Sequence, residues 1–163
     1  MRHGEALSKQ EAGVGTDAER PLAPQGLDMV NRVAQGLKTL GIKPDRVLTS
    51  ALIRAQQTAE LVASHLGCAD RVEVCQALLP DQDPAAFLDA LRELHAEGVI
   101  LAVGHQPHLG QLAAQLVFGE TRDGLALRPG GLCLIEFPEF PRSLEAVLRG
   151  LWDPESLGLR LAP

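Results

Sequence analysis

Residues 46–59 read RVLTSALIRAQQTA, and this stretch decides the fold because a short strand passes directly into a helix within it. Its first four residues predict the strand, and Ser50 is expected to cap a helix over residues 51–66. Arg54 then lies in the first turn of that helix, with Thr58 one turn later on the same face. Free backbone N–H groups and the helix dipole favour an anion at such a helix start.

A second strand–helix junction follows in residues 99–107, which read VILAVGHQP. The continuous apolar run over residues 99–103 is typical of a strand buried on both faces. Gly104 and His105 come next, and Pro107 is expected in the first turn of a helix that runs to about residue 117. Because ligands of open α/β sheets bind outside the carboxyl ends of the strands, we expect the two junctions to meet at one edge of the sheet.

The rest of the chain alternates between helix-like and strand-like patterns. Residues 5–23 lack periodicity and are predicted as a long loop, a kind of segment that is often functional in a compact domain. The alternation predicts a three-layer α/β/α fold with a mostly parallel central sheet, built as one domain over residues 1–163. The remaining predicted elements are helices over residues 25–41 and 84–96 and strands over residues 71–75, 131–137 and 144–152.

Composition and charge narrow the classes of partner. The net charge of −6 and the pI near 5.3 argue against binding of nucleic acid or of anionic membranes by the whole surface. No apolar run approaches the length of a transmembrane helix. The three cysteines have no paired spacing, which indicates reduced thiols and a cytoplasmic protein. The sequence contains no signal for an oligomeric state.

Four motifs occur in an order that resembles a known family. They read RHGEA at residues 2–6, RPLA at 20–23, SALIRAQQTA at 50–59 and VGHQP at 103–107. Together they resemble the motifs of the histidine phosphatase (phosphoglycerate mutase-like) superfamily, and most of all its SixA-type phosphohistidine phosphatases. The C-terminal pattern of that type is also present, as LRPGG at residues 127–131 followed by Trp152. The resemblance therefore covers nearly the whole chain.

The resemblance implies a role for each matched residue. His3 would be the nucleophile and become transiently phosphorylated, while Arg2, Arg54 and His105 would bind the phosphoryl oxygens. Physical chemistry agrees, because a neutral imidazole can attack phosphorus and nearby arginines disfavour its protonated form. Neither a metal nor a cofactor is required. The residues expected to line the pocket around these four are Arg20, Gly4, Ser50 and Gly104, with Gly4 also turning the backbone sharply away.

A general acid is harder to assign. Many members of the superfamily carry a carboxylate just after the strand equivalent to residues 71–75, where this chain reads QALL at 76–79. Asp81, Asp83 and Glu5 are the nearby candidates. Because a phosphoramidate has a weaker bond to its leaving group than a phosphate ester, the gap favours phosphohistidine over a stable sugar phosphate as substrate.

Three functions are consistent with these residues. The first is a phosphatase for phosphohistidine in proteins, the second a phosphatase for small phosphate monoesters with Asp81, Asp83 or Glu5 as acid, and the third a phosphate- or phosphohistidine-binding module without turnover. The partner is accordingly a phosphorylated protein or a small phosphorylated compound. Several candidates also have ordinary structural explanations, Ser50 as a helix cap, Asp81 and Asp83 as turn residues, and His108 as a polar residue at a helix start.

The position of the Arg-His-Gly triplet at residues 2–4 is unusual for the family. The resemblance implies an apolar strand before the triplet, in the middle of the sheet, and Met1 alone represents it here. Burial of about four apolar residues at about 1.5–3 kcal/mol each contributes roughly 6–12 kcal/mol, which is comparable to the stability of a whole domain. We therefore expect the first strand to be truncated and the natural protein to begin about five residues upstream.

Overall fold

β1 (Arg46–Thr49) is the central strand of a parallel sheet. It pairs with β2 (Val72–Val74) on one side and with β3 (Ile100–Val103) on the other. β4 (Leu132–Glu136) and β5 (Val147–Trp152) form a separate antiparallel ribbon. The strands lie where the sequence places them, within one to three residues at their ends. The predicted strand start at residues 144–145 falls outside the part of the chain that the structure describes.

The computed structural model describes residues 1–94, 98–121, 123, 125–138 and 146–158. Two short 3-10 turns, Ala69–Arg71 and Gln76–Leu78, flank β2. The α-helices in the described residues are α1 (Lys9–Ala12), α2 (Pro24–Thr39), α3 (Ile53–Leu66), α4 (Pro84–Glu93), α5 (His108–Phe118) and α6 (Pro154–Gly158). The predicted end of α4 near residue 96 lies among residues 95–97, which are outside the described part.

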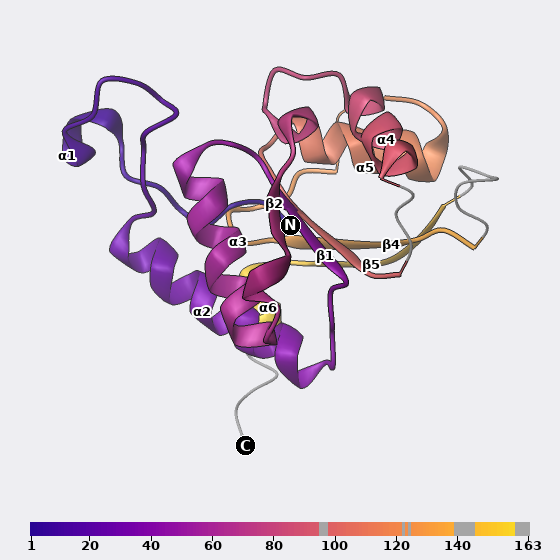
Figure 1. The fold of residues 1–163 in the computed structure, drawn as a ribbon, viewed down its shortest axis with the longest axis horizontal. Coiled ribbons are helices and arrows are strands. Elements are labelled where there is room, and N and C mark those ends of the chain that lie inside the picture. The colour runs from indigo at the N-terminus through magenta and orange to yellow at the C-terminus, as the bar shows by residue number, and fades with distance from the viewer. Residues whose placement is uncertain (95–97, 122, 124, 139–145, 159–163) are drawn as a thin grey trace.

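Side chains of the parallel sheet point alternately into two apolar cores. Val47 of β1 packs with α2, α3 and α6, whereas its neighbour Leu48 packs with α4 and α5. The same alternation places Leu101 in the first core and Ala102 against the second. Figure 1 shows the two groups of helices with the strands between them. The predicted three-layer α/β/α arrangement is therefore confirmed, and its physical basis is the period of two along each strand.

The first residues of the chain run between β3 and β4. The amide of Gly104 donates to the Met1 carbonyl at 3.2 Å, and the amide of His3 donates to the Gly104 carbonyl at 3.1 Å. On the other side, the Arg2 amide donates to the carbonyl of Gly131 at 2.9 Å. These bonds place the Arg-His-Gly triplet at the carboxyl end of β3, between the parallel sheet and the β4–β5 ribbon.

The long loop over residues 5–23 is more ordered than its sequence indicates. It contains the short helix α1, which begins with a reciprocal capping box between Ser8 and Glu11 and stands away from the rest of the fold in Figure 1. Its two ends meet again in an antiparallel bridge between Ala6 and Leu22. The entry to this loop packs tightly on α2, since a Cβ at Gly26 would lie 2.1 Å from the carbonyl oxygen of Glu5.

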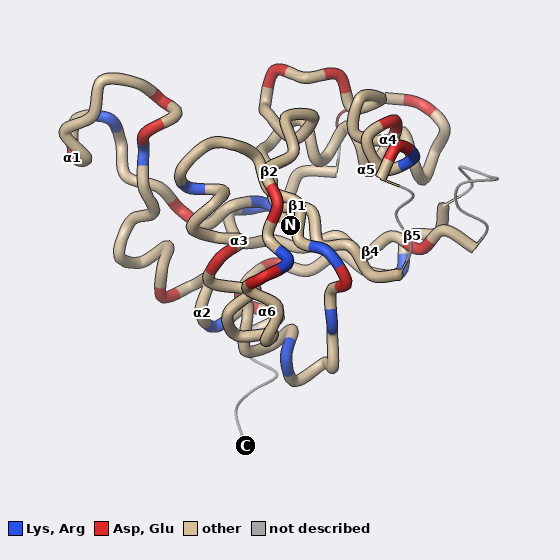
Figure 2. The backbone as a smooth tube through the Cα atoms, in the orientation of Figure 1, with Lys and Arg blue, Asp and Glu red and all other residues tan. Residues whose placement is uncertain are grey.

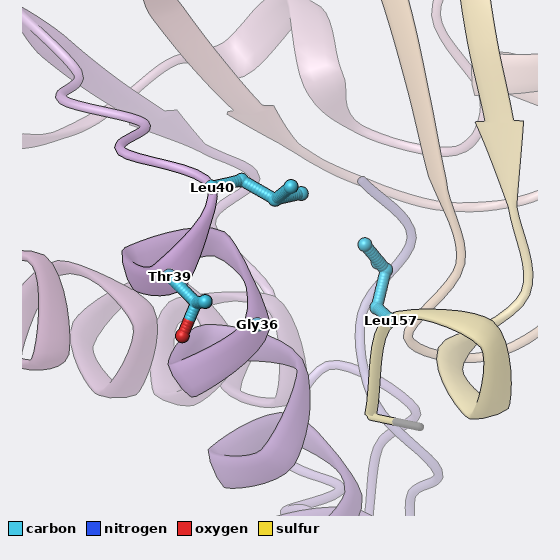
Figure 3. A pocket seen from close by; sticks show the side chains of 4 residues that line it. All are labelled: Gly36, Thr39, Leu40 and Leu157. Carbon is cyan, nitrogen blue, oxygen red and sulfur yellow. The ribbon is translucent and has the colours of Figure 1, made fainter. Parts of the chain in front are cut away.

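A pocket lies at the far end of α2 from this contact. Gly36, Thr39, Leu40 and Leu157 line it, with Leu40 and Leu157 facing each other across the junction of α2 and α6 (Figure 3). At 1.5 Å per residue, α2 places Gly36 and Thr39 about 15–20 Å along its axis from Gly26. The pocket is therefore separate from the edge of the sheet where the sequence motifs meet.

The charged residues follow no single-sign pattern along the chain. Figure 2 shows acidic and basic residues interspersed over the helices and loops of the described part. Among the described residues, none of the helices combines the length and the apolar character needed to cross a membrane.

Candidate active site

His3 is held in one orientation and in one tautomer. Its Nδ1 lies 2.6 Å from the carbonyl oxygen of Gly4, and because a carbonyl can only accept, Nδ1 carries the ring proton. The lone pair is then on Nε2, which accepts from Nε of Arg54 at 3.3 Å. Burial above all lowers the pKa of His3 to about 4; the hydrogen bond to the Gly4 carbonyl opposes this change, and the charges of Arg54, Arg2 and Arg20 contribute to it. His3 is thus a neutral imidazole near pH 7.

The backbone beside His3 is held by α3. The amide of Gly4 donates to Oγ1 of Thr58 at 3.1 Å, and this hydroxyl donates in turn to the Arg54 carbonyl at 2.7 Å. Gly4 does not have a positive φ, so the left-handed conformation that glycine tolerates does not explain glycine at this position. The need for glycine is steric instead, because a Cβ at Gly4 would lie 2.6 Å from Cγ2 of Val30 in α2.

His105 faces His3 across the site. The two ring centroids are 4.9 Å apart, with the ring planes inclined by 56°. Nε2 of His105 is 2.9 Å from Oγ of Ser50, and burial, followed by the influence of His3 and Arg54, lowers the pKa of His105 to about 3. His105 is therefore also neutral near pH 7, with its ring beside that of His3.

The side chain of Ser50 hydrogen-bonds to His105 and does not cap a helix. α3 begins at Ile53, two residues later than predicted, with Leu52 at the N-cap position. The hydroxyl of Ser50 hydrogen-bonds to Nε2 of His105 and accepts a long hydrogen bond from the Leu52 amide at 3.4 Å. Gly104 contributes through its backbone alone, by pairing with residues 1–3.

Two arginines flank the histidines. Arg54 lies in the first turn of α3 and is 6% exposed. Arg2 donates through Nη1 to the Leu127 carbonyl at 2.8 Å, and burial lowers its pKa from the usual arginine value. Nε of Arg2 and Nδ1 of His105 are buried without hydrogen-bond partners in the described part of the chain. Unpaired buried polar atoms are uncommon in native proteins, and two of them gather here.

A carboxylate that the sequence did not single out joins this cluster. Arg54 donates through Nη1 to the carbonyl oxygen of Asp17 at 2.7 Å and through Nη2 to Oδ2 of Asp17 at 2.8 Å. Arg20 donates to Oδ1 of the same residue at 2.8 Å, and its Nε donates to the Leu7 carbonyl at 2.6 Å. Hydrogen bonds from Arg20 and then from Arg54 lower the pKa of Asp17. Arg20 therefore reaches the site through Asp17, and the only sequence signal for Asp17 was the length of its loop.

The three predicted acids have other surroundings in the described part of the chain. Oδ1 of Asp83 caps α4 by accepting from the Ala85 amide at 2.8 Å. Asp81 is exposed, and Glu5 is exposed with its backbone carbonyl bonded to the Ala23 amide. Within the described residues, none of these carboxylates forms a hydrogen bond or an ion pair with any of the four predicted catalytic residues.

His108 starts α5 as predicted, but it is buried where a polar helix-start residue is ordinarily exposed. Burial lowers the pKa of His108, and nearby Asp83 opposes this change. Neither ring nitrogen of His108 has a hydrogen-bond partner in the described chain. Over the same residues, no three His, Cys, Asp or Glu side chains come together as a set of metal ligands.

The arrangement combines a nucleophile with an anion site. A neutral imidazole with its lone pair on Nε2 lies beside the guanidinium of Arg54, with Arg2 and His105 close by. Such a set can attack an electrophilic centre while it stabilises negative charge on the oxygens around that centre.

Known proteins share these motifs and this fold. Residues 1–78 match the family described as Histidine phosphatase superfamily (branch 1). The chain is 40% identical over 135 residues to an uncharacterized protein of Picosynechococcus sp. (strain PCC 7002), covering 81% of this chain and 79% of the relative. It is 37% identical over 123 residues to phosphohistidine phosphatase SixA of Escherichia coli, covering 74% of each.

Comparison with solved structures identifies the same family. The solved structure of the protein histidine phosphatase SixA complexed with tungstate matches with a TM-score of 0.84 and 28% identity over 96% of both chains. The family and the fold expected from the motifs are thus confirmed.

Proposed function

This chain belongs to the histidine phosphatase superfamily, and we propose that it is a phosphatase that removes phosphoryl groups from histidine side chains of proteins. In this proposal residues 1–163 act as one domain, and the reaction passes through a covalent phosphohistidine at His3. The observation that carries it is the geometry of His3, whose Nδ1–H is held by the Gly4 carbonyl while Nε2 presents a lone pair beside Arg54. The comparisons support the substrate class, since a relative is a phosphohistidine phosphatase, SixA, and a solved SixA structure holds tungstate, a tetrahedral oxyanion like phosphate.

In the first step, Nε2 of His3 attacks the phosphorus atom. The Nε2–P bond forms while the P–N bond of the substrate breaks, and the leaving imidazole takes the electron pair and a proton from solvent. Arg2 and Arg54 stabilise the charge on the equatorial oxygens, where the planar donors of arginine fit well. The Gly4 carbonyl stabilises the positive charge that develops on the ring of His3.

In the second step, water attacks the phosphorus of the His3 adduct. The new P–O bond forms as the Nε2–P bond breaks, inorganic phosphate leaves with both protons of the water, and Nε2 recovers its lone pair. His105 is neutral, so it does not repel the positive charge that the ring of His3 carries while it is phosphorylated.

The pairing of the carboxylates in the described residues bears on the leaving group. Asp17 is the one carboxylate of the described residues that is paired with the site's arginines, and those arginines keep it ionised. An ionised carboxylate cannot donate a proton to an alkoxide leaving group. A phosphoramidate needs less help from a strong acid, which favours phosphohistidine over a phosphate monoester.

Trapping of the intermediate tests the proposal. The protein is exposed to a small phosphodonor such as phosphoramidate, and the labelled residue is mapped by mass spectrometry under conditions that preserve phosphohistidine. We expect the label on His3, its loss in His3→Ala, and its retention in His65→Ala, which removes a histidine from the last turn of α3. A label elsewhere, or equal hydrolysis of a phosphohistidine peptide by His3→Ala and wild type, would contradict the proposal.

A substrate panel separates the alternatives. Hydrolysis of a phosphohistidine peptide should exceed that of p-nitrophenyl phosphate in kcat/KM. Faster turnover of the monoester, lost on substitution of Asp81, Asp83 or Glu5, would instead assign a monoester phosphatase. Tight phosphate binding without labelling of His3 would assign a binding module.

A further inference from the structure

Asp17 binds both arginines that reach the site from outside the N-terminal triplet. Its carboxylate bridges them, with Oδ1 on Arg20 and Oδ2 on Arg54, each at 2.8 Å. Arg20 is itself anchored by its bond to the Leu7 carbonyl. The loop is also docked on α3, since the amide of Ile53 donates to the carbonyl of Ala18 at 3.0 Å. Two independent contacts therefore hold this part of the loop against the start of α3.

The contacts to Arg54 determine how its guanidinium is turned. The group has five N–H donors in one plane. Nη1 of Arg54 donates to the backbone carbonyl oxygen of Asp17, and Nη2 donates to its Oδ2. Nε of Arg54 is then directed at Nε2 of His3. Two acceptors from a single residue restrain both the direction and the plane of the guanidinium. One N–H on each Nη atom remains for a ligand.

We propose that Asp17 is a positioning residue, which holds Arg54 so that the Nε side of its guanidinium faces the group transferred to His3. This inference rests on the proposed function, because it assigns Arg54 to the phosphoryl oxygens. Asp17 itself does not touch the substrate. It acts as the outer partners of metal ligands do, by orienting a residue that makes the contact.

The energy of the ion pair does not explain the arrangement. The side chain of Asp17 is 56% exposed while that of Arg54 is 7% exposed, so solvent at the carboxylate screens the ion pair and limits its contribution to stability. Alignment has a larger effect, since a displacement of about 1 Å at a catalytic group can cost about 100-fold in rate. Loss of Asp17 should accordingly reduce catalysis more than it reduces the free energy of unfolding.

A change from carboxylate to amide separates orientation from charge. Asp17→Asn keeps the size of the side chain, removes its charge and weakens its hydrogen bond with Nη2 of Arg54. Attraction of a simple anion then persists or increases, because a negative charge near Arg20 and Arg54 disappears. Binding of vanadate as a trigonal-bipyramidal adduct at His3 should weaken, because binding in that geometry depends on aligned hydrogen-bond donors.

The experiment compares inorganic phosphate with vanadate. Both are titrated calorimetrically into wild type, Asp17→Asn, Asp17→Glu and the matched control Asp89→Asn, which breaks an exposed Asp–Arg pair on α4. We expect Asp17→Asn to bind vanadate at least about 10-fold more weakly and to lose kcat by a similar factor. Its affinity for phosphate should be unchanged or tighter, its unfolding midpoint close to that of wild type, and Asp17→Glu should recover part of the loss.

Other results would overturn the inference in distinguishable ways. Tighter binding of both oxyanions by Asp17→Asn would identify Asp17 as a competitor for Arg54. Equal weakening of both, together with a lower unfolding midpoint, would identify a merely structural role. Absence of vanadate binding by the wild type would also reject it. If His3 is never labelled but vanadate binding still depends on Asp17, the positioning role stands and the proposed catalysis fails.

Discussion

Acidification is expected to destabilise the fold through the buried nucleophile. The pKa of His3 is lowered from 6.5 to about 4 in the folded protein. Between these two values the unfolded chain binds a proton that the folded chain does not, so the free energy of unfolding falls as the pH falls through this window. At 1.36 kcal/mol per pKa unit the full shift corresponds to about 3 kcal/mol. From about pH 7 to about pH 4.5, the loss attributable to His3 is about 2 kcal/mol.

Urea unfolding of wild type and His3→Gln at the two pH values isolates this contribution. Many carboxylates titrate in the same range, but they are common to both proteins and cancel in the comparison. The variant should therefore lose about 2 kcal/mol less than wild type on acidification. His105→Gln should change the pH dependence in the same direction, because the pKa of His105 is also lowered, to about 3.

Equal losses in wild type and His3→Gln would refute the reasoning. Such a result would mean that His3 has an ordinary pKa in the folded protein. The nucleophile would then be protonated in part near neutral pH, and the argument for a lone pair held ready on Nε2 would fail.

Two further predictions concern the backbone around the nucleophile. Gly26→Ala should lower the free energy of unfolding in urea by about 1–3 kcal/mol, because its Cβ would meet the Glu5 carbonyl at 2.1 Å; an unchanged midpoint would contradict the contact. Thr58→Val should cost about 1–3 kcal/mol and reduce kcat, since it leaves the amide of Gly4 buried without an acceptor. Thr39→Val is the matched control, because the exposed hydroxyl of Thr39 also donates to the carbonyl four residues earlier. It should lower the free energy of unfolding by no more than about 0.5 kcal/mol.

The strand–helix junctions were predictable because their signals are local. The apolar run of β3, the glycine that follows it and the start of α5 lie within a few residues of one another. The same holds for β1 and for the position of Arg54 in the first turn of α3. Hydrophobic period and turn chemistry act over such short distances, so sequence alone located both junctions.

The meeting of the two junctions was predictable, but the individual side-chain contacts between distant segments were not. Ser50 looked like a helix cap because caps are common after strands, but its hydroxyl meets His105, 55 residues later. Asp17 and Arg54 are 37 residues apart, and no periodicity connects an aperiodic loop to a helix start. The close approach of Val30 in α2 to Gly4 likewise has no signal in the local sequence.

Sequence by itself determined which groups gather at the candidate site. Two histidines and two arginines at the ends of strands, in ordered motifs, predict a nucleophile and an anion site. Tertiary structure decided the state of those groups. The tautomer of His3, its lowered pKa and the clamp of Asp17 on Arg54 all depend on burial and on contacts between loops. These are properties of three-dimensional approach, because dielectric environment and hydrogen-bond geometry exist only after the chain has folded.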